Sequence, residues 1–196
     1  MRRAVLGMAA AMAVSLGTTS AAAAESRTYI SGSFGLFQHT DIEDAYGDEL
    51  SFEMGPYFSG AVGVALGNGA RVEFELGVTA FDGDEFESGG YVYDASSVEV
   101  SATILTVGGY YDIQTKGGIS PYVGVGLGFA SWEIDYGALD SDGTDLAAFA
   151  EFGLNIKAGR NATFAPSYRF LWIDNGEQGI DDSTAHIFKA GVRFFF

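Results

Sequence analysis

Hydrophobic and polar residues alternate with a period of two along most of this chain. In the segment 71–81, aliphatic and aromatic side chains occupy the even positions, whereas arginine, glutamate and threonine occupy most of the odd ones. Strict alternation over this length predicts a β-strand with one apolar and one polar face. The same pattern recurs, so we expect eight strands, at residues 29–37, 58–66, 71–81, 98–113, 121–132, 146–158, 162–173 and 186–196.

One of these segments changes phase. In 98–113 the apolar positions are even as far as Ala102, but they are odd from Leu105 onward. An extra residue in one strand moves every later side chain to the other face. The pattern therefore predicts a β-bulge near Ile104.

The connections between the predicted strands alternate in length. Those at 67–70, 114–120 and 159–161 are short, whereas those at 38–50, 82–97, 133–145 and 174–183 are long. Short turns at one end and long loops at the other are typical of a barrel that crosses an outer membrane. Closure leaves no strand edge with unpaired backbone groups in lipid. We therefore predict an all-β chain that forms an eight-stranded antiparallel up-and-down transmembrane β-barrel.

A soluble lipocalin-like barrel is the main structural alternative. Such a barrel turns its apolar face inward toward a ligand, whereas a membrane barrel turns it outward. Here the face opposite the aliphatic residues carries Ser, Gly, Glu and Arg, which favours a packed polar interior. Aromatic residues near both predicted ends favour interfacial girdles. They are Tyr110, Tyr111, Tyr122, Phe194 and Phe196 near the short turns, and Phe37, Phe52, Trp132 and Trp172 near the long loops.

The first 24 residues are typical of a cleavable export signal. Arg2 and Arg3 precede an apolar run over 4–16, and small residues continue to Ala24. A membrane anchor is the alternative, but the run is shorter than the roughly 20 apolar residues that a spanning helix needs. We therefore expect a signal peptide at 1–24, cleavage after Ala24, and a barrel domain at 25–196.

Composition narrows the classes of function. The chain has 10 Lys and Arg against 26 Asp and Glu, with a formal net charge of −16 and a pI near 4.2. This balance argues against a nucleic-acid partner, because binding to phosphates depends on basic residues. The absence of cysteine excludes a disulfide scaffold, a thiol nucleophile and cysteine-ligated metal sites.

Three segments carry a resemblance to a known family. Residues 121–130 resemble the fifth strand of the small outer-membrane β-barrels, which include opacity-type, OmpA-like and porin-like surface proteins of Gram-negative bacteria. Residues 167–170 resemble the Tyr-Arg pair on the seventh strand of that family. The last nine residues are similar to the terminal signature that the barrel-assembly machinery recognises, through Phe188, Val192, Phe194 and Phe196. The resemblance implies an outer-membrane location, contact with membrane lipids and lipopolysaccharide, and no cofactor.

Charged residues on the polar faces form the first candidate site. By alternation we expect four acids and four bases to point into the barrel: Arg71, Glu73, Glu75, Glu99, Glu151, Arg169, Lys189 and Arg193. Buried charges persist when they are paired, and eight strands leave an interior just wide enough for side chains. We interpret the cluster as a structural plug. The alternative is a gated ion path, which would make the protein a narrow cation-preferring channel.

Acidic residues dominate the long loops. Together the four loops carry 19 acids and no Lys or Arg. Such a rim attracts cations and offers carboxylates to Ca²⁺ or Mg²⁺, including ions that crosslink lipopolysaccharide phosphates. Asp140, Asp142 and Asp145 resemble a weak divalent-cation loop, although Gly143 comes too early for a calcium-binding motif. A solvated acidic surface is the simpler interpretation.

Two histidines, His39 and His186, are the candidates for catalysis by an imidazole. Some outer-membrane barrels of this size modify lipid A, and Ser183 with His186 offers a loose match to a serine–histidine pair. No Asn or Glu at a suitable spacing orients that histidine. We therefore predict a non-enzymatic surface protein whose loops serve envelope integrity, or contact host or environmental ligands. The narrow channel and the lipid A-modifying enzyme remain the alternatives.

Overall fold

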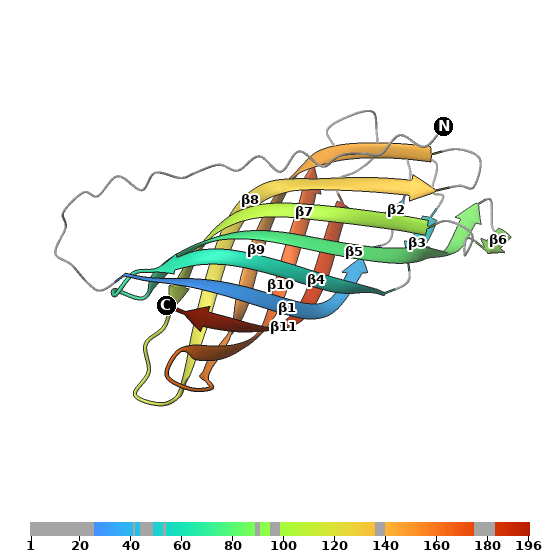
Figure 1. Ribbon diagram of the computed structural model, residues 1–196. Helices are drawn as coiled ribbons and strands as arrows, with labels where there is room; N and C mark the ends of the chain where they lie inside the picture. Colours follow the sequence, from blue (N-terminus) through green and yellow to red (C-terminus); the bar gives the residue numbers. More distant parts are fainter. Residues whose placement is uncertain are drawn as a thin grey trace.

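The computed structural model describes residues 26–40, 42–43, 49–52, 54–88, 91–94, 99–135, 140–174 and 183–196. The expected signal peptide and its cleavage site lie outside these residues. Eight long strands form a closed antiparallel barrel (Figure 1): β1 (Arg27–His39), β4 (Gly55–Ala65), β5 (Ala70–Ser88), β7 (Glu99–Asp112), β8 (Ile119–Asp135), β9 (Asp140–Lys157), β10 (Ala162–Asp174) and β11 (Ser183–Phe195). The predicted eight-stranded barrel is confirmed.

Closure of the barrel depends on the first and last long strands. β1 pairs with β4 on one side and with β11 on the other, in an unbroken register from Tyr29 opposite Phe195 to His39 opposite Ala185. Each remaining long strand pairs with its neighbours in the chain, including β5 with β7. Among the described residues, no helix has the length and hydropathy needed to cross a membrane.

Three short strands extend the sheet at the long-loop end. β3 (Glu49–Phe52) and β6 (Tyr91–Asp94) both pair with the end of β5, and β2 (Ile42–Glu43) pairs with β3. β5 itself runs to Ser88, well past the predicted end of its strand. The predicted loop 133–145 is also largely strand, because β8 and β9 remain paired as far as Asp135 and Asp140.

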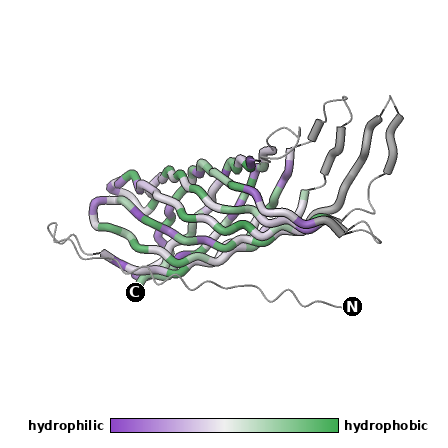
Figure 2. Tube along the Cα trace, turned by 90° about the horizontal axis from the view of Figure 1, so that it is seen from above, coloured by the Kyte–Doolittle hydropathy of each residue, from purple (hydrophilic) through white to green (hydrophobic). Residues whose placement is uncertain are grey.

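The outward face of the barrel is apolar. Where side chains are described, every second residue of each long strand projects outward, and many of these side chains are about half exposed, with Val125 65% and Leu127 62% exposed. In Figure 2, hydrophobic and hydrophilic residues alternate along the strands of the barrel. A continuous apolar surface of this size is unstable in water and suits a lipid environment. The lipocalin-like alternative is therefore wrong.

The predicted bulge near Ile104 is absent. β7 pairs in unbroken register with both β5 and β8 along its length. Val100, Ile104 and Thr106 are all buried, so the even positions face inward throughout the described part of this strand. The prediction failed because it assumed that apolar residues always point outward, whereas Val100 and Ile104 pack inside the barrel.

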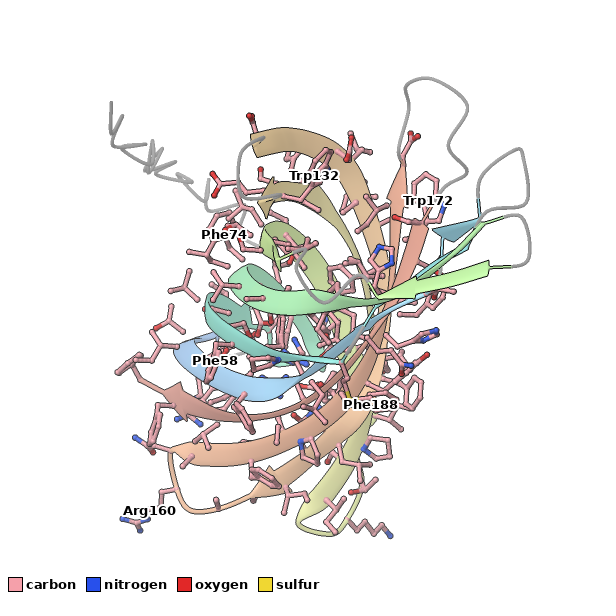
Figure 3. All side chains as sticks on the ribbon, turned by 90° about the vertical axis from the view of Figure 1, so that its right-hand side faces the viewer. Phe58, Phe74, Trp132, Arg160, Trp172 and Phe188 are labelled. Atoms are coloured by element: carbon pink, nitrogen blue, oxygen red, sulfur yellow. The ribbon has the colours of Figure 1, made fainter. Side chains whose placement is uncertain are left out.

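The predicted aromatic girdles are only partly correct. Tyr111, Phe194 and Phe196 are exposed at the short-turn end, as expected. Tyr110, Tyr122 and Phe37 are instead buried inside the barrel. Trp132 and Trp172 lie near the long-loop end in Figure 3, but the indole of Trp132 donates a hydrogen bond to Asp145. The side chain of Phe52 lies outside the described residues.

Candidate functional site

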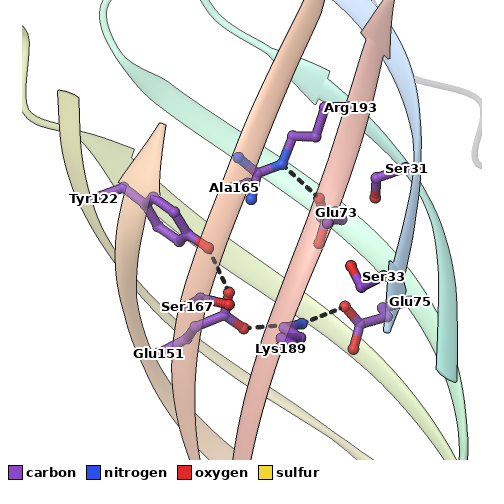
Figure 4. Close-up of a pocket in the computed structure, with 11 residues that line it drawn as sticks. Ser31, Ser33, Glu73, Glu75, Tyr122, Glu151, Ala165, Ser167, Lys189 and Arg193 are labelled. Atoms are coloured by element: carbon purple, nitrogen blue, oxygen red, sulfur yellow. Dashed lines mark hydrogen bonds and ion pairs between the residues drawn. The ribbon is translucent and has the colours of Figure 1, made fainter. Parts of the chain in front are cut away.

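A ring of paired charges crosses the middle of the lumen. Arg169 Nη1 lies 2.6 Å from Glu75 Oε1, and its Nη2 lies 2.7 Å from Glu151 Oε2. Lys189 Nζ completes the ring at 2.7 Å from Glu75 and 3.2 Å from Glu151 (Figure 4). These four side chains come from β5, β9, β10 and β11, and all are buried. Each charge therefore has two partners of opposite sign.

Tyrosine hydroxyls add further hydrogen bonds to this ring. Tyr57 donates a 2.9 Å hydrogen bond to Glu75, and Tyr122 donates one of 2.8 Å to Glu151. The Tyr110 hydroxyl accepts a hydrogen bond from Arg169 Nη2 at 3.2 Å. Inward glycines on adjacent strands make room for the rings: a Cβ at Gly77 would collide with Tyr57.

A second polar layer lies closer to the short turns. Tyr29 donates a 2.7 Å hydrogen bond to Glu73 and accepts one of 3.0 Å from Arg71 Nη1. Arg71 Nε also lies 3.0 Å from both carboxylate oxygens of Asp112. Arg193 Nε lies 3.8 Å from Glu73. Each carboxylate in this layer has a cationic partner, so the charges of the layer also balance one another.

An apolar layer fills the lumen between the charge ring and the long loops. Its members are buried side chains from six of the long strands: Phe37, Val100, Ile104, Ala130, Ala147, Phe149, Leu171, Ile173, Ala185 and Ile187. Phe149 joins the two layers, since the Arg169 guanidinium carbon lies 4.1 Å from its ring centroid. The cavity between the charge ring and the second polar layer is about 10 Å³, which is room for about one water molecule. The lumen is therefore a packed core without a continuous aqueous path through its described part.

Comparison with known proteins identifies the family. The model of the outer membrane protein beta-barrel domain matches residues 6–196. This chain belongs to that family. An outer-membrane barrel has short turns on the periplasmic side and longer loops outside the cell, which gives the strands described above their orientation. No curated protein sequence gives a significant match.

Several solved structures share the fold of this outer-membrane barrel at low sequence identity. Neisserial surface protein A has 19% identity and a TM-score of 0.63, with 86% of this chain and 97% of that chain covered. OprG from Pseudomonas aeruginosa has 13% identity and a TM-score of 0.61, covering 87% and 95%. Ail of Yersinia pestis, solved with the heparin analogue sucrose octasulfate, has 16% identity and a TM-score of 0.52, covering 86% and 99%.

The structure brings together seven of the eight residues expected in the lumenal cluster. Arg71, Glu73, Glu75, Glu151, Arg169, Lys189 and Arg193 are all buried within the two polar layers. Glu99 is at the outer end of β7, opposite Asp82 and Asp135, and its side chain lies outside the described residues. The eighth charge near these layers is instead Asp112, which bonds Arg71 and accepts a 2.9 Å hydrogen bond from Asn155.

The other candidate residues do not converge on one site. Asp140, Asp142 and Asp145 lie on strand β9 rather than in a loop. Asp142 is exposed, whereas Asp145 points to the other face and binds the Trp132 indole. Among the described residues, no group of three acids or histidines is arranged to hold a metal ion. The side chain of Asp140 is outside that set.

Ser183 and His186 are similarly separated. Ser183 is buried on the lumenal face of β11, whereas His186 is on the outward face. His186 Nδ1 shares a 2.6 Å hydrogen bond with the Tyr168 hydroxyl. The serine and histidine of the predicted pair therefore point to opposite sides of the strand. Among the signature residues at the end of the chain, Phe188, Val192, Phe194 and Phe196 all project outward toward lipid.

Sequence reasoning missed the inward tyrosines. None of these side chains is more than 4% exposed, and each hydroxyl forms a hydrogen bond with a charged side chain in the lumen. They are Tyr29, Tyr57, Tyr110 and Tyr122. The alternation itself contained the signal. Tyr122 is two residues before Gly124 and Tyr110 is two residues after Gly108, so each tyrosine lies on the same polar face as its glycine. The girdle interpretation relied on their position near the strand ends and not on the face of the strand to which they belong.

Proposed function

We propose that this outer-membrane barrel is a non-enzymatic surface protein whose acidic loops support envelope integrity or bind cationic partners outside the cell. The packed lumen is the observation that carries the proposal. Within the described residues, the apolar layer and the two neutralised polar layers block the lumen between the long loops and a cavity of about 280 Å³ at the short-turn end, which Arg71, Asp112 and Arg193 help to line. On the outer side of the membrane, the loops and the outer rim are then the parts that a partner can reach.

The acidic outer rim favours cations as the binding chemistry. Glu133 and Asp142 occupy directly opposite positions on β8 and β9, and both are exposed. Like charges placed opposite each other destabilise a strand pair unless cations or water screen them. Divalent ions that bridge such carboxylates to lipopolysaccharide phosphates would relieve this repulsion and link the barrel to its membrane. A polyanion such as the heparin analogue bound by Ail is a poor match for this rim.

Neutralising the loops tests the proposal. Asp and Glu in all four loops are replaced by Asn and Gln, and the control variant replaces the eight Ser, Thr and Asn residues of the same loops by Ala. We expect the neutral loops to raise outer-membrane permeability to a hydrophobic dye and to lower adhesion to a cationic surface. The control variant should behave as the parent. Wild-type permeability and adhesion in the neutral variant would refute the proposed role.

A narrow cation-preferring channel is the second candidate, since charged residues do line the lumen. The four bases Arg71, Arg169, Lys189 and Arg193 are balanced by three glutamates and Asp112, so the two polar layers have no net negative charge to select cations. The apolar layer adds a barrier to water and ions. We expect no conductance from the parent in planar bilayers, and conductance after Leu171 and Ile187 are both changed to Ser. A conducting parent whose current falls on changing Glu75 to Gln would favour the channel instead.

A further inference from the structure

A cavity of about 280 Å³ lies at the short-turn end of the lumen. Its inner wall is the second polar layer, from which Arg71, Asp112 and Arg193 line it. Gln114 and Lys157 line it as well and are exposed, so the cavity is open toward the periplasm. Pockets that hold small molecules begin at roughly 300 Å³. This cavity is therefore large enough for a small solute, and the packed layers separate it from the long loops.

The charged residues that line the cavity are mainly basic. Arg71, Lys157 and Arg193 contribute three positive charges, whereas Asp112 contributes one negative charge. Asp112 already accepts hydrogen bonds from Arg71 Nε at 3.0 Å and from Asn155 Nδ2 at 2.9 Å. The lining therefore has an excess of two positive charges.

Arg193 is the least closely paired of the four bases in the polar layers. Its Nε lies 3.8 Å from Glu73 Oε2 (Figure 4), and Arg71 Nη1 lies 3.7 Å from the same oxygen. Arg169, by contrast, lies 2.6 Å from its nearest carboxylate oxygen. Arg193 Nη1 donates a hydrogen bond to the neutral amide of Asn155. A buried guanidinium is stable when a hydrogen-bonded counter-charge accompanies it, so an anion in the cavity would stabilise Arg193.

A row across three strands places hydrogen-bond donors side by side in the cavity. Thr163 on β10 is directly opposite Lys157 on β9 and Arg193 on β11, and all three residues line the cavity. Neighbouring strands are about 4.8 Å apart, so the backbones of the two basic residues are separated by about 10 Å. Their long side chains can both reach a group bound over the Thr163 hydroxyl. Hydrogen bonds from cations to an oxyanion are roughly twice as strong as those between neutral groups.

Basic residues also surround the opening of the cavity. Arg27 is on the lumenal row of β1, and its guanidinium carbon lies 5.1 Å from the ring centroid of Phe195, which lines the cavity. The exposed charged side chains described at this end are all basic: Arg27, Lys116, Lys157 and Arg160. No ion pair among the described residues includes any of these four. A field of one sign at the mouth of a cavity attracts small ions of the opposite sign.

We propose that this cavity binds a small periplasmic solute that carries a carboxylate or a phosphate group, with that group held by Lys157, Thr163 and Arg193. The neutral polar side chains of Gln114 and Ser120 also line the cavity and suit the remainder of a polar solute. A solute reaches the cavity through its opening between the short turns without crossing the packed layers. The acidic loops are at the opposite end of the barrel, so this site is independent of the function proposed for them.

Nuclear magnetic resonance of the isotope-labelled barrel in uncharged maltoside micelles tests the proposal. Sodium phosphate and sodium acetate are the two probes, and each replaces sodium chloride at constant ionic strength and neutral pH. At least one probe should shift the amide signals of Lys157, Thr163 and Arg193 in a saturable manner, and a response to only one identifies the preferred group. We expect Lys157→Gln to raise the apparent dissociation constant roughly twofold to fivefold, as for loss of a partly exposed ion pair. Thr163→Val, which removes the hydroxyl and keeps the shape, should raise it as well.

Lys116→Gln is the matched control. Lys116 is exposed in the turn between β7 and β8, at the same end of the barrel, but it does not line the cavity. This variant should bind the probes as the parent does.

Three results would overturn the proposal. The first is the absence of saturable shifts with both probes. The second is an unchanged dissociation constant in Lys157→Gln and Thr163→Val, with heat-dependent migration in SDS gels showing that both variants are folded. The third is equal weakening by Lys116→Gln and Lys157→Gln, because the anions would then respond to the general field of the basic end and not to a site.

Discussion

Replacing Arg169 by Met tests whether the central charge ring stabilises the barrel. Arg169 is fully buried, and its guanidinium contacts Glu75, Glu151 and the Tyr110 hydroxyl. Its loss leaves two buried carboxylates that share one cation, Lys189. Removing one partner from a buried ion pair typically costs about 3–5 kcal/mol, because an uncompensated charge remains. We expect Arg169→Met to lower the free energy of unfolding by an amount in this range.

A second substitution should recover part of the loss. Changing Glu75 to Gln in the Arg169→Met background leaves Lys189 paired with Glu151, at 3.2 Å, and restores the charge balance of the ring. Coupling between residues of one network is usually about 0.5–3 kcal/mol. The double variant should therefore be less destabilised than the sum of the two single variants by an amount in this range.

Urea unfolding in lipid vesicles, followed by Trp fluorescence and by heat-dependent migration in SDS gels, measures these differences. Arg160→Met is the matched control, because Arg160 is exposed in the turn between β9 and β10 and projects away from the barrel in Figure 3. A surface change of this kind alters stability little. If Arg169→Met unfolds at the same urea concentration as Arg160→Met, or if the two single effects add without coupling, the ring does not stabilise the barrel as argued.

Three further predictions concern assembly, packing and chemistry. Deleting Phe196, which is 70% exposed at the end of the terminal signature, should lower the amount of folded barrel in outer-membrane fractions by several fold, as measured by heat-dependent gel migration. Gly77→Val should cost about 1–3 kcal/mol in urea unfolding, because its side chain would overlap the Tyr57 ring, whereas Gly109→Val should not. His186→Ala should leave the mass spectrum of lipid A unchanged on expression, and a mass shift that depends on His186 would support the enzyme hypothesis.

The strand count and the direction of the faces could be predicted because both depend on local alternation. Polar and apolar residues on opposite faces of a strand have a period of two, so Phe74 and Leu76 point to lipid while Glu73 and Glu75 point inward. Closure followed from a physical requirement, since an open edge in lipid would leave backbone groups without partners. These inferences needed no knowledge of which strands pair beyond neighbours in the chain.

Contacts inside the lumen could not be predicted in the same way. Alternation places Arg169 inward, but its pairing with Glu75, 94 residues earlier, depends on the curvature of the whole barrel. The assumption of a uniformly polar interior also failed. The outer half of the lumen is filled by residues such as Ile104, Leu171 and Ile187. The alternation of residues along a strand does not by itself distinguish an inward apolar residue from an outward one. Tertiary packing decides that question.

The distribution of charge separates the stability of the barrel from its surface chemistry. In the polar layers, four bases are matched by Glu73, Glu75, Glu151 and Asp112, so these layers contribute no net charge. The four long loops hold 19 of the 26 acids and none of the basic residues, so they account for the net negative charge of the chain. Because the lumenal pairs do not depend on the loop acids, loop charge can change without unpairing the core. Neutral loops should therefore alter binding at the cell surface while the urea midpoint of the barrel stays close to that of the parent.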